Sequence, residues 1–269
     1  MGYKTILVHV DASAASSDRI RLAAGLARAA GAHLVGSALT GVSRFVSPAM
    51  AACGDARLAE RCAALRRDAA LALQRFDALV RAEALLSSEA RLIDDDADGG
   101  MSVQARYCDL VVVGQAGAAA PGQRDDLPEY LLLTSTRPVL VVPHADHAGA
   151  LDGPALVAWD GSVEATRAVA GALPLLRAAR STTVVAFGED AAPCAQLAAW
   201  LGRHGIAART GHSMLDVDIG EALLTMAADL GAGLLVMGGY GHARYRELLL
   251  GGVTATVLRA MTLPVLLAH

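Results

Sequence analysis

Apolar and polar positions alternate along the chain in a pattern that predicts short buried strands separated by longer helices. Tyr3–Val10 is an aliphatic and β-branched run that ends at an aspartate and is followed by a helical pattern over Ser16–Ala30. Ala155–Trp159 is a similar run, which also ends at an aspartate and is followed by a helical pattern over Glu164–Ala178. Both segments therefore predict a strand, an aspartate, a short turn and a helix.

Two further landmarks recur in the same order in both parts of the chain. A buried strand leads into G-x-x-G at Gly114 and again at Gly238, and a T-x-P-V-L sequence begins at Thr136 and again at Thr262. Three matches in one order indicate an internal duplication, which would give the two parts the same fold.

The strand and helix pattern also indicates the fold class. Strands that alternate with longer helices are typical of parallel sheets built from βαβ units. We expect an α/β fold of two tandem, doubly wound, five-stranded parallel sheets of the flavodoxin or Rossmann type, in domains spanning residues 1–146 and 153–269. The halves differ mainly between their second and third strands, where residues 51–86 of the first half predict a long helix. The second and third strands themselves are expected at Leu34–Leu39, Glu89–Ile93, Thr183–Phe187 and Ala207–Thr210.

Composition narrows the classes of function. The 269 residues carry a formal net charge of -4, which argues against a nucleic-acid binder that works through a general basic surface. Lys4 is the single lysine among 23 basic residues, so the chain lacks the lysine of a Walker A loop and a plausible Schiff-base lysine. The four cysteines have no C-x-x-C spacing and the N-terminus has no signal-peptide core, which predicts a cytoplasmic protein. No apolar stretch reaches about 18 residues, so we expect no membrane-spanning helix.

A glycine-rich segment in the second half carries the strongest chemical signal. Gly238 and Gly241 follow a strand, and Gly251 and Gly252 precede a helical pattern that begins at Val253. Backbone amides at glycines and at a helix N-terminus form an anion site suited to phosphate. Isolated glycines more often serve as turns and caps, but ligands of doubly wound sheets bind where this segment is expected, at the carboxyl ends of the strands.

These motifs make the chain similar to a tandem universal stress protein. Nucleotide-binding members of that family carry G-x2-G-x9-G-[ST], whose three glycines match Gly238, Gly241 and Gly251. The resemblance implies a stress-response protein that binds an adenine nucleotide, ATP, in its C-terminal half, with magnesium accompanying the nucleotide if it binds. By this resemblance the base would lie beside Ala158, Trp159 and Asp160, and the ribose and phosphates along Met237, Gly238, Gly241, Gly251, Gly252, Val253 and Thr254.

The chain departs from the family pattern at two places. Gly252 stands where the pattern has Ser or Thr, and losing one hydrogen bond to a charged group would weaken binding by about 1.5–3 kcal/mol. In the first half Leu127 stands where the third glycine would be, so we expect that half to be a degenerate, structural copy.

No catalytic residue is assigned. The glycine loops have no general base or metal-binding carboxylate pair beside them, so we expect at most slow ATP hydrolysis. Asp94-x-Asp96-x-Asp98 resembles the start of a calcium loop, but the twelfth position is Ala105 instead of Glu. Together with Asp218 in the second half, this pattern favours helix N-caps over a metal site.

Two alternatives stay open. The first is a nucleotide-free module that binds an unknown protein partner, in which, by family resemblance, Val139–Val142 and Val265–Leu267 pair across a pseudo-twofold and cover both sheet edges. The oligomeric state beyond this internal pair, a homodimer included, is open. The second is an enzyme of the adenine-nucleotide α-hydrolase-like class, which would need a phosphate loop after the first strand; Asp160-Gly161-Ser162-Val163 has too few glycines for one.

Overall fold

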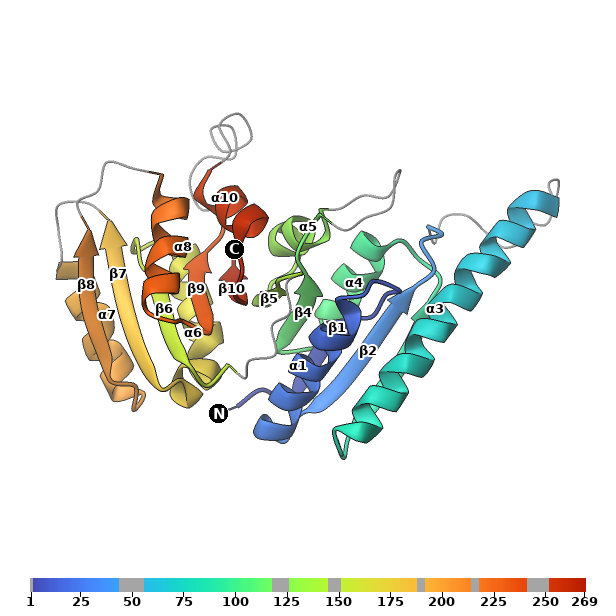
Figure 1. Ribbon diagram of the computed structural model, residues 1–269, viewed down its shortest axis with the longest axis horizontal. Coiled ribbons are helices and arrows are strands. Elements are labelled where there is room, and N and C mark those ends of the chain that lie inside the picture. Colours follow the sequence, from blue (N-terminus) through green and yellow to red (C-terminus); the bar gives the residue numbers. More distant parts are fainter. Residues whose placement is uncertain are drawn as a thin grey trace.

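The computed structural model describes residues 2–43, 56–117, 126–144, 151–187, 192–213, 218–240 and 252–269, and it confirms an α/β fold in which strands and helices alternate (Figure 1). The first half contains β1 (Thr5–His9), α1 (Ser16–Ala30), β2 (His33–Leu39), α3 (Ala56–Ala82), β3 (Ser88–Ile93), α4 (Ala97–Ala105), β4 (Leu110–Gly114), α5 (Leu127–Thr134) and β5 (Val139–Val142). The second half contains β6 (Pro154–Ala158), α6 (Val163–Ala178), β7 (Ser181–Phe187), α7 (Ala192–Arg203), β8 (Ala208–Ser213), α8 (Ile219–Asp229), β9 (Leu234–Gly238), α10 (Val253–Ala260) and β10 (Val265–Ala268).

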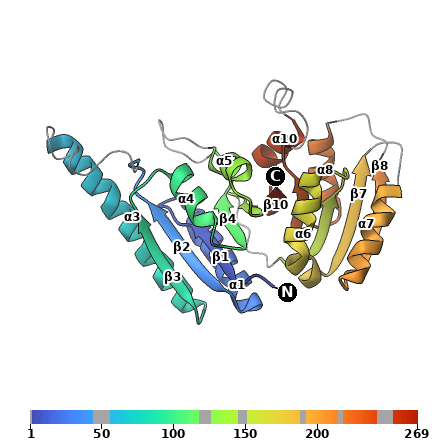
Figure 2. The ribbon, with the colours of Figure 1, turned by 180° about the vertical axis from the view of Figure 1, so that it is seen from behind.

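All these strands join in one sheet of ten strands, in the order β3-β2-β1-β4-β5-β10-β9-β6-β7-β8. Within each half the strands are parallel and follow the order 3-2-1-4-5, which is the Rossmann order and not that of flavodoxin. The order of connection therefore reverses between β1 and β4, and again between β6 and β9. β3 and β8 form the two outer edges of the sheet (Figure 2).

The two halves meet through their last strands, as the family resemblance implies. β5 and β10 pair in antiparallel fashion, with Leu266 opposite Leu140 at the centre of the pair. Both side chains are fully buried. The two sheets expected from the sequence are thus one continuous sheet, and neither half has a free edge at this seam.

Helices cover both faces of the sheet, so the central strands are buried on both sides. This explains their continuous apolar sequences, such as that of β4, because a strand with helices on both faces needs no polar positions. One apolar core lies under α1, α3, α6 and α7, and the other under α4, α5, α8 and α10. Each core contains residues from both halves, so the two halves pack as one unit.

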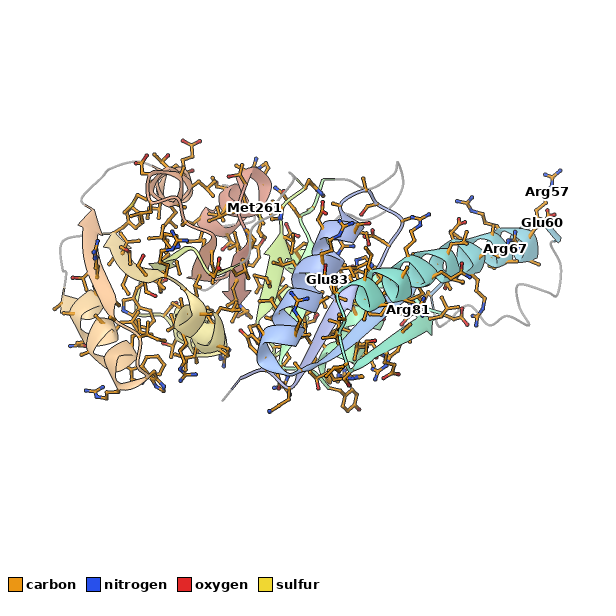
Figure 3. The ribbon with its side chains drawn as sticks, turned by 60° about the horizontal axis from the view of Figure 1, so that its bottom comes forward. Arg57, Glu60, Arg67, Arg81, Glu83 and Met261 are labelled. Carbon is orange, nitrogen blue, oxygen red and sulfur yellow. The ribbon has the colours of Figure 1, made fainter. Side chains whose placement is uncertain are left out.

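The long helix expected over residues 51–86 is α3, whose 27 residues compare with 12 in α7, its counterpart in the second half. Its first turns extend beyond the rest of the molecule, with Arg57 and Glu60 at the far end (Figure 3). Two largely exposed ion pairs join it to its neighbours: Arg66 with Asp94, and Glu83, just beyond its last residue, with Arg28 at 2.9 Å. None of the helices in the described residues is long and apolar enough to span a membrane.

The helix caps predicted from the aspartate clusters are confirmed. Asp96 accepts a hydrogen bond of 2.7 Å from the amide of Gly99 at the start of α4. Asp218 accepts from the amides of Gly220 and Glu221 at the start of α8. These carboxylates satisfy amides that have no partner inside the helix, which is the usual reason for an acidic residue at this position.

Candidate functional site

The candidate site of the second half lies at the carboxyl ends of β6 and β9, where the order of connection reverses. These neighbouring parallel strands pair up to Val157 opposite Val236, so Ala158 and Met237 come next to each other. The structure thus places the residues predicted to lie beside the base next to the first of those predicted to lie along the ribose and phosphates. Gly241 and Gly251, which also belong to the predicted site, lie outside the described residues.

The turn after β6 is held by its own side chains. The Asp160 carboxylate accepts a hydrogen bond of 2.9 Å from the amide of Ser162, and Gly161 between them has a left-handed backbone with φ of 75°. The Ser162 hydroxyl accepts in turn from the amide of Ala165 and caps α6. Asp160 is exposed, while Trp159 and Ala158 are half-buried. The carboxylate thus lies at the surface on a turn of defined shape.

The two glycines at the end of β9 lie against neighbouring segments. A Cβ atom on Gly238 would lie 2.6 Å from the backbone nitrogen of Ala165, because the start of α6 crosses directly over this strand end. A Cβ atom on Gly239 would collide with the side chain of Leu132, which belongs to the first half. The sequence predicted that Gly238 allows the backbone to approach a ligand; in the structure it allows a helix to approach.

The helix α10 presents its N-terminus beside this strand end. It begins at Val253, and its N-cap residue Gly252 has no side chain to accept from the amides of the first turn. Thr254 is 2% exposed, and its hydroxyl oxygen accepts a hydrogen bond of 3.3 Å from the amide of Tyr240. Thr254 therefore ties the segment after β9 to α10, a contact that sequence reasoning did not foresee.

The equivalent place in the first half holds a buried arginine. Arg19 comes eight residues after Asp11, as Ala168 comes eight residues after Asp160. Its side chain is 3% exposed and donates to the Asp11 carboxylate at 2.8 Å and to the carbonyl oxygen of His9 at 2.9 Å. The guanidinium packs closely on Gly114: a Cβ atom at this position would lie 2.4 Å from its Nη1 atom. The sequence signal for this cation was an arginine on the buried face of α1, where the second half has alanine.

Burial and this cation together set the charge states nearby. The pKa of His9 is lowered to about 4, first by burial and then by the charge of Arg19, while Asp11 acts in the opposite direction. Burial alone would raise the pKa of Asp11, but Arg19, His9 and Ser13 outweigh burial and hold that pKa well below its usual range. The first half thus places a neutral histidine, His9, beside the ion pair of Arg19 and Asp11.

The described residues hold no cluster of three or more His, Cys, Asp or Glu side chains that could bind a metal ion. Burial raises the pKa of the Cys108 thiol to about 12, so this cysteine is a core residue and not a nucleophile.

Comparison with known proteins confirms the family resemblance for the second half. Residues 153–269 match the model of the universal stress protein family. No curated protein matches the chain.

The first two of the following solved structures share the fold over the whole chain. A universal stress protein from Archaeoglobus fulgidus DSM 4304 is 18% identical, with 98% of this chain and 97% of that chain covered and a TM-score of 0.75. A functionally unknown protein from Pseudomonas aeruginosa PAO1 is 17% identical, with 98% and 92% covered and a TM-score of 0.61. A shorter universal stress protein from Archaeoglobus fulgidus, in complex with dAMP, matches 52% of this chain and 98% of its own, at 16% identity and a TM-score of 0.38.

Proposed function

We propose that the second half binds an adenine nucleotide, ATP, as a signal or ligand in a cytoplasmic stress-response protein, and that the first half is a structural copy that binds none. The observation that carries this proposal is the contrast between the two points where the order of connection reverses. In the first half the buried guanidinium of Arg19 packs against Gly114. In the second half a small residue, Ala168, takes the place of Arg19. The N-cap of α10 is Gly252, whereas that of its counterpart α5 is Asp126, whose carboxylate would repel a phosphate.

The chemistry of the second half suits a phosphate group. The first amides of a helix have no partner within the helix and carry its positive partial charge, and no side chain caps them at Gly252. A phosphate held here would be bound by backbone amides from Gly252 onwards. The base would lie beside Asp160 and Trp159, at the end of the neighbouring strand.

We infer that ATP turnover, if any, is slow. Phosphoryl transfer depends on charge stabilisation and on a group that orients the attacking water. No base or cation is among the residues proposed to lie along the ribose and phosphates, which are Met237, Gly238, Gly241, Gly251, Gly252, Val253 and Thr254. Magnesium would be held mainly by the phosphates of the nucleotide.

Equilibrium binding of labelled ATP to the full chain tests the proposal. We expect saturable binding that becomes about 10-fold tighter or more in Gly252→Ser, because the serine adds a hydroxyl that can donate to a charged phosphate oxygen. Asp160→Ala should weaken binding, while Asp152→Ala, an exposed carboxylate ahead of β6, should leave it unchanged. The proposal is wrong if neither the wild type nor Gly252→Ser shows saturable binding at millimolar ATP.

A second candidate is an interaction module that binds no nucleotide. It is favoured by two contacts of the glycine segment: Gly238 is required by the packing of α6, and the Thr254 hydroxyl already bonds to the amide of Tyr240. Both residues would then serve the fold alone. The same binding experiment separates the two candidates, since only the first predicts a response to Gly252→Ser.

A further inference from the structure

The two halves differ in how their paired helices cover the sheet. In the first half α1 and α3 pack directly against each other, and the ring of Phe76 from α3 lies on Gly36 of β2 with no exposed surface. In the second half the described residues of α6 and α7 hardly touch. The duplicated unit therefore has one tightly packed copy and one loosely packed copy of the same helix pair.

The space between α6 and α7 is a cavity of about 380 Å³. Pockets that bind small molecules usually have volumes of about 300–1,000 Å³ and mostly apolar walls. Both tryptophans of the chain, Trp159 and Trp200, line this cavity. The remaining lining residues are Gly161, Thr166, Val169, Ala170, Pro193, Gln196 and Leu197, and none of them is charged.

The polar groups in the lining are few. The Thr166 hydroxyl donates to the carbonyl oxygen of Ser162 at 2.8 Å, which leaves its oxygen free to accept. Gln196 is an exposed side chain whose amide can both donate and accept. Trp200 packs on His204 with ring centroids 4.2 Å apart. Indole faces with one or two neutral hydrogen-bonding groups suit a flat aromatic ligand and disfavour a charged one.

The cavity and the proposed phosphate site lie on opposite faces of the sheet. Val169, Leu197 and both indoles belong to the core under α6 and α7, whereas Val253 at the start of α10 packs against the other core. The turn after β6 joins them, because Trp159 lines the cavity and would also lie beside the base of the proposed nucleotide.

We propose that the cavity between α6 and α7 binds a small, uncharged, planar aromatic molecule, at a site separate from the proposed nucleotide site. The ligand stacks on an indole face, and the amide of Gln196 bonds to its polar edge. Apart from Trp159 and Gly161, its walls come from α6 and α7, which contribute no residue to the proposed nucleotide site.

The test uses the uncharged probe N-phenyl-1-naphthylamine with the full chain. We expect saturable binding of one probe per chain, with energy transfer from tryptophan, because both tryptophans line the cavity. Ala170→Phe fills the cavity from an exposed position and should weaken binding at least 10-fold. Ala228→Phe, the same change at an exposed position of α8 on the opposite face, should leave it unchanged.

Saturating ATP should not displace the probe. Displacement by ATP would identify the cavity as part of the nucleotide site and overturn the proposal of a separate site. Unsaturable binding, several probes per chain or full affinity in Ala170→Phe would also overturn it. If Ala170→Phe fails to fold, quenching of tryptophan fluorescence by acrylamide in the wild type replaces it as the test. Bound probe should protect both tryptophans from acrylamide, and unchanged quenching would contradict the proposal.

Discussion

Two arginine–aspartate ion pairs involving α1 have the same nitrogen-to-oxygen distance but differ in how far their side chains are exposed. Arg19 and Asp11 are joined at 2.8 Å with side chains 3% and 32% exposed, and Arg21 and Asp18 at 2.8 Å with side chains 52% and 39% exposed. An exposed ion pair contributes little because water and salt screen it. Removing one partner of a buried pair leaves an uncompensated charge, so the first pair matters far more to the fold.

Arg19→Met keeps most of the volume of the side chain and removes its charge. We expect it to lower the free energy of unfolding by about 2 kcal/mol, less than the 3–5 kcal/mol of a fully buried pair because Asp11 is partly solvated. Arg21→Met, the matched control on the same helix, should cost under about 1 kcal/mol. Urea denaturation measures both, and equal effects of the two variants would contradict the structural role of Arg19.

The histidine beside this pair makes stability depend on pH. The pKa of His9 is lowered to about 4, below the usual value of about 6.5, so the unfolded chain takes up a proton before the folded chain does. Stability should therefore be lost as pH falls from about 6.5 to about 4, by up to about 3 kcal/mol. The stabilisation from Asp11, whose pKa is also lowered, should be lost only at lower pH. Denaturation curves of His9→Gln should be flatter across this window, and an unchanged slope would refute the role of His9.

At the scale of single residues, the sequence predicted contacts between near neighbours better than contacts between distant segments. Asp96 and Asp218 were predictable caps because the partner amides lie within three residues. The packing of Gly238 on α6 was not predictable, because it depends on how that helix crosses the sheet. For the same reason the guanidinium of Arg19 on Gly114 was missed.

At the scale of elements, periodicity located most helices and strands. The predicted bounds of α1 agree with the observed ones, because its apolar positions repeat along one helical face. The helix ends at Gly31, which adopts the left-handed conformation common at this position. The length of α3 was also visible in its sequence. The gap between α6 and α7 was not, because the spacing of two helices depends on side chains from several segments.

The cap of α8 offers a test at this scale. Asp218→Ala should lower the free energy of unfolding by about 1 kcal/mol, because two amides at the start of the helix lose their acceptor. Asp229→Ala changes an exposed aspartate at the other end of α8, where a negative charge opposes the helix dipole, and should be neutral or slightly stabilising. Thermal unfolding of both variants measures the difference, and an equal loss in both would contradict the capping role.

At the scale of the whole molecule, the continuous sheet and the two shared cores predict that both halves unfold together. Tryptophan fluorescence reports only on the second half, because Trp159 and Trp200 are the two tryptophans of the chain, whereas far-ultraviolet circular dichroism reports on both halves. The urea transitions seen by the two probes should coincide. Arg19→Met, a change in the first half, should shift both equally. A tryptophan transition that does not move would show that the halves unfold separately.

The two halves share one fold, and we propose that only the second binds a nucleotide. Amide hydrogen exchange of the full chain, with and without saturating ATP and magnesium, compares the two halves in one experiment. We expect slower exchange at the turn after β6 and at the start of α10, and unchanged exchange at the turn after β1 and the end of β4. No protection anywhere, or equal protection in both halves, would contradict this proposal.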